Sequence, residues 1–98
     1  MKINMKKAGN TLTLALEGRL DTMTAPQLEK AINENIDGVE ELVIDLKELE
    51  YMSSAGLRVL LSAEKKMKIC GRMVVKNVND MIMEIFEVTG FVDILTIE

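Results

Sequence analysis

The feature that most constrains the fold is the alternation of short apolar runs with longer segments of helical periodicity. Residues 42–44 (Leu-Val-Ile) and 73–75 (Met-Val-Val) are continuous apolar runs, the pattern of strands that are covered on both faces. Between them, Leu57, Leu60 and Met67 recur at helical spacing. Strands that alternate with helices predict a layered α/β domain with a mostly parallel sheet.

Local signals mark where the predicted helices begin and end. Thr24 and Gln27 have the spacing of a capping box, so one helix should begin there. Each of the three predicted helices ends near a glycine, at Gly38, Gly71 and Gly90. We expect these glycines to adopt the left-handed conformation of a C-terminal cap.

The two ends of the chain complete the predicted sheet. Residues 11–17 alternate polar and apolar, and with residues 2–5 and the turn at 8–10 they predict an antiparallel hairpin. A last strand is expected at residues 92–97. A chain of 98 residues has room for one core, so we expect one domain, residues 1–98. Its predicted fold is a small layered sheet, mostly parallel with an N-terminal antiparallel hairpin, flanked by helices.

Charge and composition argue against several functions. The formal charge is -4 without a long basic stretch, so nucleic acid is not an expected partner. The apolar runs are far shorter than the roughly 20 residues of a membrane span, and residues 1–10 lack the apolar segment of a signal peptide. The single Cys70 cannot form an internal disulfide and is expected to be buried on its helix. We therefore expect a cytoplasmic protein that does not insert into a membrane.

Residues 51–56 (Tyr-Met-Ser-Ser-Ala-Gly) stand where the second predicted helix should begin. A serine hydroxyl there can cap backbone N–H groups, which stabilises a helix by about 0.5–2 kcal/mol. Gly56 costs about 1 kcal/mol in a helix relative to alanine, so we expect another backbone to approach it closely. The same helix start can accept a phosphate, because free N–H groups and the helix dipole favour negative charge. A serine here is thus either a cap or a phosphorylation switch.

Five segments in order resemble the STAS domain, specifically the small anti-sigma-factor antagonists of bacteria. They are Gly-Arg-Leu-Asp at 18–21, Thr-Ala-Pro at 24–26, "LVIDL" at 42–46, "YMSSAGLRVLL" at 51–61 and "EIFEVTGFVDIL" at 84–95.

The resemblance implies a non-enzymatic, partner-switching regulator. Such proteins bind an anti-sigma factor that is also a serine kinase, displace its sigma factor, and are released when the kinase phosphorylates them. A phosphatase then restores the active form. In the family the target serine lies in an Asp-Ser-(Ser or Thr)-Gly-Leu string, and the match of Gly56 and Leu57 to its last two residues places the target at Ser54.

Two departures from that string affect the predicted site. Ser53 replaces the Asp, which removes a negative charge beside the phosphoacceptor and leaves Ser53 as a competing acceptor, and Ala55 replaces the second Ser or Thr. Asp21 matches an acidic position near the serine in the family fold and would supply part of the missing charge. An equally weighted alternative is that Asp21 is a loop carboxylate that hydrogen-bonds its own backbone.

The remaining expectations concern the partner surface and the alternatives. Of the eight methionines, most should fill the core, whereas Met23 and Met52 flank the loops nearest Ser54 and can offer adaptable contacts. The residues expected to bind the partner are Asp21, Met23, Met52, Ser53, Ala55 and Gly56.

Two alternatives to the switch remain. The chain can be a non-switching STAS subunit of a stress-sensing or membrane-transport assembly, with Ser54 only a cap. An enzyme with Ser54 as nucleophile is disfavoured, since the chain has no His and no Ser-x-x-Lys spacing there. No cofactor is expected, and no Gly-x-x-x-x-Gly-Lys loop supports nucleotide binding.

Overall fold

The alternating residues near the start of the chain form the predicted hairpin. In the computed structural model, which describes all 98 residues, β1 (Lys2–Ala8) pairs antiparallel with β2 (Thr11–Leu20). Gly9 has a φ of 60° in the connecting turn, a left-handed conformation that glycine adopts without steric cost. Leu12, Leu14 and Leu16 of β2 are buried, because the period-two pattern places them on one face of the sheet.

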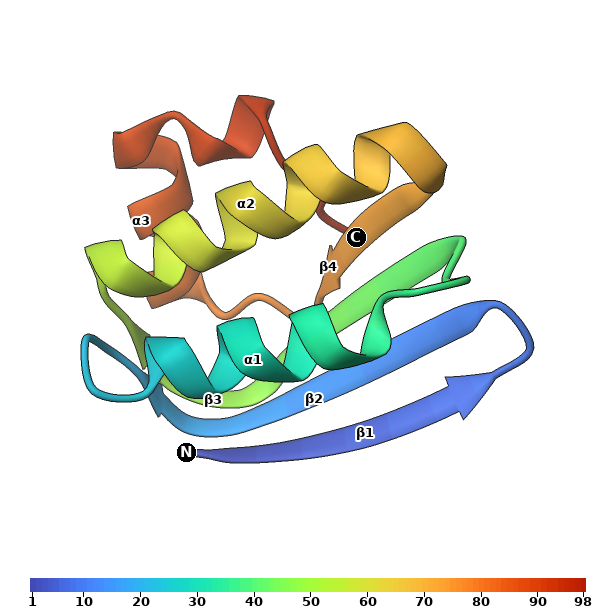
Figure 1. Ribbon diagram of the computed structural model, residues 1–98. Coiled ribbons are helices and arrows are strands. Elements are labelled where there is room, and N and C mark those ends of the chain that lie inside the picture. The colour runs from blue at the N-terminus through green and yellow to red at the C-terminus, as the bar shows by residue number, and fades with distance from the viewer.

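The rest of the sheet is parallel. β3 (Glu41–Met52) pairs parallel with β2, and β4 (Arg72–Lys76) pairs parallel with β3, which gives the strand order β1-β2-β3-β4 (Figure 1). This mixed sheet confirms the predicted α/β class and its N-terminal antiparallel hairpin.

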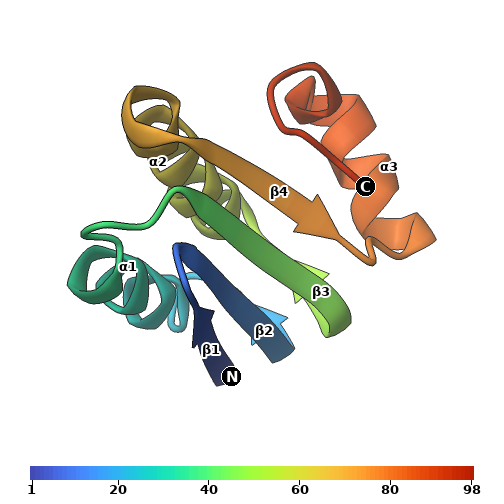
Figure 2. The same ribbon diagram turned by 90° about the vertical axis from the view of Figure 1, so that its right-hand side faces the viewer.

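Three helices complete the fold. Helices α1 (Ala25–Asn35) and α2 (Ser54–Cys70) contact each other and cover one face of the sheet (Figures 1 and 2). Helix α3 (Asp80–Thr89) contacts β3, and Figure 2 shows it on the other side of β4 from α1 and α2. None of the helices combines the length and the hydrophobicity that a membrane-spanning helix needs.

A single cluster of 23 buried residues forms the core. The strand register aligns Leu14, Ile44 and Val75 across three strands, so their side chains meet the helices on the same face. Burial of each such aliphatic side chain contributes about 1.5–3 kcal/mol. Val43 and Val74 are also buried, as the apolar runs predict, but they lie outside this cluster, as expected for neighbours that point to the opposite face.

The predicted last strand at residues 92–97 is wrong for most of its length. Phe91–Asp93 forms a short 3-10 helix, η1, and only Ile97 makes a bridge to Val75 of β4. The N–H groups of Ile94 and Leu95 donate to the carbonyl of Phe91. These donors are therefore used locally and are unavailable for pairing with the sheet.

Two predictions about helix ends are also corrected. The hydroxyl of Thr24 does not cap α1, because it accepts from the N–H of Asp21 (2.9 Å) in the preceding loop and donates to the carbonyl of Arg19 (2.8 Å) near the end of β2. Gly90 is the left-handed cap of α3 as predicted, with a φ of 80°. Gly38 is also left-handed, with a φ of 78°, but α1 already ends at Asn35 and its cap is Ile36. Gly71 instead has an extended φ of 170°.

The predicted burial of Cys70 is wrong as well. Met67 is the last buried residue of α2, and Cys70 is exposed. The final turn leaves the core before the chain reverses into β4, so Ile69 is 89 % exposed too.

Candidate functional site

The carboxyl ends of two neighbouring parallel strands bring the predicted site segments together. Leu20 at the end of β2 is in register with Met52 at the end of β3, and the N–H of Ser53 donates to the carbonyl of Leu20 (2.9 Å). The loop that follows β2 and the first turn of α2 are therefore held side by side. We call this region, residues 21–24 and 53–59, the serine end of the sheet.

The two serines of this region have different environments. Ser53 is the N-cap residue of α2, but its hydroxyl makes no capping hydrogen bond, and its Oγ is buried without a partner. The helix cap that the sequence predicts from a serine here is therefore not formed by the N-cap residue. The hydroxyl of Ser53 lies in the interior, and its backbone carbonyl accepts from the N–H of Leu57. Ser54 is the first helical residue and is exposed.

Gly56 is buried against side chains of its own domain. A Cβ at this position would lie 2.7 Å from Cγ of Leu20 and 3.1 Å from Cγ of Met52. The prediction that another backbone approaches Gly56 is wrong, because the atoms that lie this close belong to the side chains of Leu20 and Met52. This small residue lets the start of α2 sit on the ends of β2 and β3.

Asp21 organises the loop that faces the serines. Its Oδ1 accepts from the N–H groups of Met23 (3.0 Å) and Thr24 (3.1 Å), and its Oδ2 lies 3.9 Å from Nε of Arg19. Desolvation raises the pKa of Asp21, but the hydrogen bonds from Thr24 and Met23 and the charge of Arg19 outweigh it and hold the pKa below its usual value. This geometry matches the interpretation of Asp21 as a carboxylate that hydrogen-bonds its own backbone.

The two methionines predicted to contact a partner differ in solvent exposure. Met23 is 86 % exposed at the tip of the loop, whereas Met52 is 1 % exposed. The prediction that Met52 offers a contact to a partner is wrong for its side chain, since β3 buries it in the core cluster. Ala55 is half-buried beside Ser54 and is packed against that cluster.

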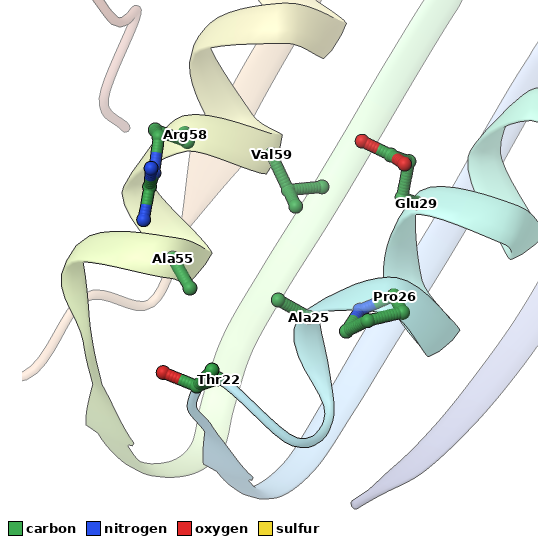
Figure 3. A pocket seen from close by; sticks show the side chains of 7 residues that line it. All are labelled: Thr22, Ala25, Pro26, Glu29, Ala55, Arg58 and Val59. Carbon is green, nitrogen blue, oxygen red and sulfur yellow. The ribbon is translucent and has the colours of Figure 1, made fainter.

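A shallow groove of about 260 Å³ lies between the first turns of α1 and α2. Its lining residues are Thr22, Ala25, Pro26, Glu29, Ala55, Arg58 and Val59 (Figure 3). In Figure 3 the guanidinium of Arg58 points along α2 toward Ala55 and the first turn of the helix. The sequence prediction did not include Arg58, although its position four residues after Ser54 places both on one helix face.

A second cation lies near the ends of the same strands. The guanidinium of Arg19 is 4.4 Å from the centre of the Tyr51 ring, a distance typical of a cation–π contact. Arg19 and Tyr51 are also in register between β2 and β3. Arg58 therefore lies within the serine end, and Arg19 lies next to it on β2, two residues before Asp21. The first turn of α2 contains no acidic residue.

The fold and this site define a small α/β domain that presents a helix start and an adjoining loop, without a cluster of His, Cys, Asp or Glu suited to a metal. The model of the STAS domain family matches residues 2–98. The chain belongs to the STAS domain family.

Similar proteins agree with this assignment. BtrV of Bordetella bronchiseptica is 35 % identical over 99 % of this chain and 85 % of its own length. The anti-sigma-B factor antagonist of Bacillus subtilis is 28 % identical over 99 % of this chain and 90 % of its own.

Solved structures share the fold. The anti-sigma factor antagonist SpoIIAA in its unphosphorylated form matches with a TM-score of 0.79 at 18 % identity, covering 99 % of this chain and 87 % of that one. The phosphorylated form of SpoIIAA, from Bacillus, matches with a TM-score of 0.78 at 19 % identity, covering 99 % and 91 %.

Proposed function

We propose that this chain is a cytoplasmic anti-sigma factor antagonist that binds an anti-sigma factor with serine kinase activity through the serine end, and that phosphorylation of Ser54 releases it. The single observation that carries the proposal is the exposure of Ser54 on the first turn of α2, next to the loop of Asp21 and Met23. A kinase can reach this hydroxyl, whereas the Oγ of Ser53 is buried.

The environment of Ser54 supports a phosphate without disruption of the fold. A phosphoserine carries about -1.5 to -2 charge at neutral pH, and the free N–H groups and dipole at a helix start favour such charge. The absence of acids from the first turn avoids repulsion, and Arg58 lies on the same helix face. The domain should therefore stay folded when phosphorylated.

The same phosphate would weaken a partner that packs closely on this surface. The groove beside Ser54 is lined mainly by small uncharged or apolar side chains, and its two charged residues, Glu29 and Arg58, have opposite signs. A doubly charged, hydrated group placed there has to be desolvated by any partner that covers it. Binding and release are thus controlled by one atom, Oγ of Ser54, and a phosphatase that removes the phosphate would restore binding.

The test uses the full chain and the serine kinase anti-sigma factor encoded in the same genome. Calorimetry should show that Ser54→Ala binds as the wild type does, and that Ser54→Asp binds at least about tenfold more weakly, a loss of about 1.4 kcal/mol. Incubation with ATP and Mg²⁺ should release the wild type but not Ser54→Ala.

Ser53→Ala is the matched control, because it removes the neighbouring hydroxyl and leaves Ser54 in place. It should remain a substrate, and fragmentation of the tryptic peptide spanning residues 48–58 should locate the phosphate on Ser54. Equal affinities of Ser54→Ala and Ser54→Asp, or phosphate on Ser53, would contradict the proposed switch. Tight binding with no phosphorylation would instead favour a constitutive subunit of a larger assembly.

A further inference from the structure

The negative charge of the chain is concentrated at its carboxyl-terminal end. Residues 77–98 contain five acidic residues and no Lys or Arg. The preceding 76 residues contain all 12 basic residues and the other 11 acidic ones. The net charge of -4 therefore arises entirely from the segment that forms α3, η1 and the bridge to β4.

Helix α3 presents an apolar stripe to solvent in addition to the one that anchors it. Ile82 and Phe86 are fully buried in the core cluster. Met81, Ile85 and Val88, which recur at helical spacing, form a second stripe that we call the outer face of α3. Met81 is 47 % exposed and Val88 is 80 % exposed.

The outer face is hollowed and lies next to further exposed apolar side chains. A depression of about 350 Å³ is lined by its three residues together with Glu84 and Thr89. Val92 and Ile94 of the following segment are each 40 % exposed, and η1 packs against α3. Apolar surface gathered in this way on a small domain is typical of an interaction site.

Unpaired carboxylates border the outer face. At about 100° per residue, Asp80, Glu84 and Glu87 fall on the flank of the stripe away from Ile82 and Phe86. Neither these acids nor Asp93 take part in any of the ion pairs of the structure, whereas Glu98 pairs with Arg72. The outer face thus combines a shallow apolar groove with a rim of uncompensated negative charge.

We propose that the outer face of α3 docks an amphipathic helix of a partner protein, with Lys or Arg residues beside its apolar stripe. The negative charge around the outer face indicates which kind of partner fits the groove. A second copy of this chain would place the same acidic rim against itself, and anionic lipid or nucleic acid would be repelled. A basic amphipathic helix fills the groove with its apolar residues and pairs with the rim, the helix-in-groove mode of recognition. This surface is independent of Ser54 and of the proposed switch.

A designed peptide tests the proposal on the intact protein. The probe is a fluorescein-labelled amphipathic peptide of roughly 14 residues, with leucines at helical spacing and lysines on the flanks, titrated with full-length protein and followed by anisotropy. We expect saturable binding to the wild type that weakens at least about tenfold in Val88→Ser, from lost apolar contact, and also in Glu84→Lys. A peptide with Glu in place of every Lys should not bind.

Matched variants separate this site from general attraction to an acidic protein. Ile69→Ser removes an equally exposed aliphatic side chain from α2, and Glu34→Lys makes the same charge change on the exposed surface of α1. Both should bind the peptide as the wild type does. Equal weakening by Glu34→Lys and Glu84→Lys, or no binding to the wild type, would overturn the proposal. Sedimentation that shows a dimer lost in Val88→Ser would overturn it in favour of self-association.

Discussion

At the residue scale, the neighbouring side chains of Ser53 and Ser54 differ in exposure, because the end of β2 holds the start of α2 in one orientation. Ser53, Ser54 and Gly56 stand out in the sequence, and the structure brings them to the loop of Asp21 as expected. Which of the two hydroxyls is accessible cannot be predicted from the sequence, because that depends on the bond between the N–H of Ser53 and the carbonyl of Leu20. Such a contact joins residues more than 30 positions apart and leaves no local pattern.

Gly56→Ala should destabilise the domain although alanine is the better helix former. The helix gains about 1 kcal/mol, but the new methyl group overlaps Leu20 and Met52. Both neighbours are almost fully buried, so they cannot move aside, and overpacking of this kind typically costs about 1–3 kcal/mol. Urea denaturation followed by circular dichroism should show a lower midpoint.

Ser54→Ala is the control for this measurement, because Ser54 is exposed on the same turn of α2. Its free energy of unfolding should stay within about 0.5 kcal/mol of the wild type. A Gly56→Ala variant more stable than the wild type would show that the ends of β2 and β3 can rearrange around α2.

At the element scale, the strands and helices that are predicted correctly are those determined by local sequence patterns. The hairpin, the two parallel strands and the three helices are encoded by local periodicity, and the structure confirms them. The final strand and the cap of α1 failed because other groups compete for the same atoms. The carbonyl of Phe91 accepts from the N–H groups of Ile94 and Leu95. The hydroxyl of Thr24 is bonded to the backbone of Arg19 and Asp21.

Glu98→Pro should loosen the edge of the sheet at β4. The N–H of Glu98 donates to the carbonyl of Val75 (2.9 Å), and its carboxylate pairs with Arg72 (2.9 Å). Proline has no N–H, so this variant loses a backbone bond as well as the charge. We expect it to be less stable by about 0.5–1.5 kcal/mol than Glu98→Gln, which loses only the charge.

Hydrogen exchange is the sharper readout of the same change. The N–H of Val75 donates to the carbonyl of Thr96, and its exchange should accelerate in Glu98→Pro relative to Glu98→Gln. Equal protection of Val75 in the two variants would mean that the bridge at Ile97 does not hold the chain against β4.

At the scale of the whole molecule, one continuous core ties every layer together. Its 23 residues come from β2, β3, β4 and all three helices, together with Val39 between α1 and β3 and Leu95 beyond α3. A domain of this size with a single core is expected to unfold in one cooperative step. Because Ile82 and Phe86 anchor α3 in this core, the outer face of the helix can be exposed and acidic without loss of the packing that holds the helix.

The single Tyr51 and the absence of Trp make this cooperativity measurable. Tyrosine fluorescence reports on the end of β3, and far-ultraviolet circular dichroism reports on all helices. The two urea transitions should coincide in midpoint and slope. A dichroism transition that precedes the fluorescence transition would indicate that α3 detaches from the core first.

The antiparallel course of β1 also decides where anything fused to the protein would sit. Because β1 runs opposite to β2, Met1 returns to the end of the sheet where β2 stops, and its carbonyl accepts a hydrogen bond from Nε2 of Gln27 on α1 (3.2 Å). An affinity tag or extra domain joined there would emerge beside the groove and obstruct it. One joined after Glu98 would leave from the opposite edge, next to β4, so immobilisation through the carboxyl terminus keeps Ser54 open.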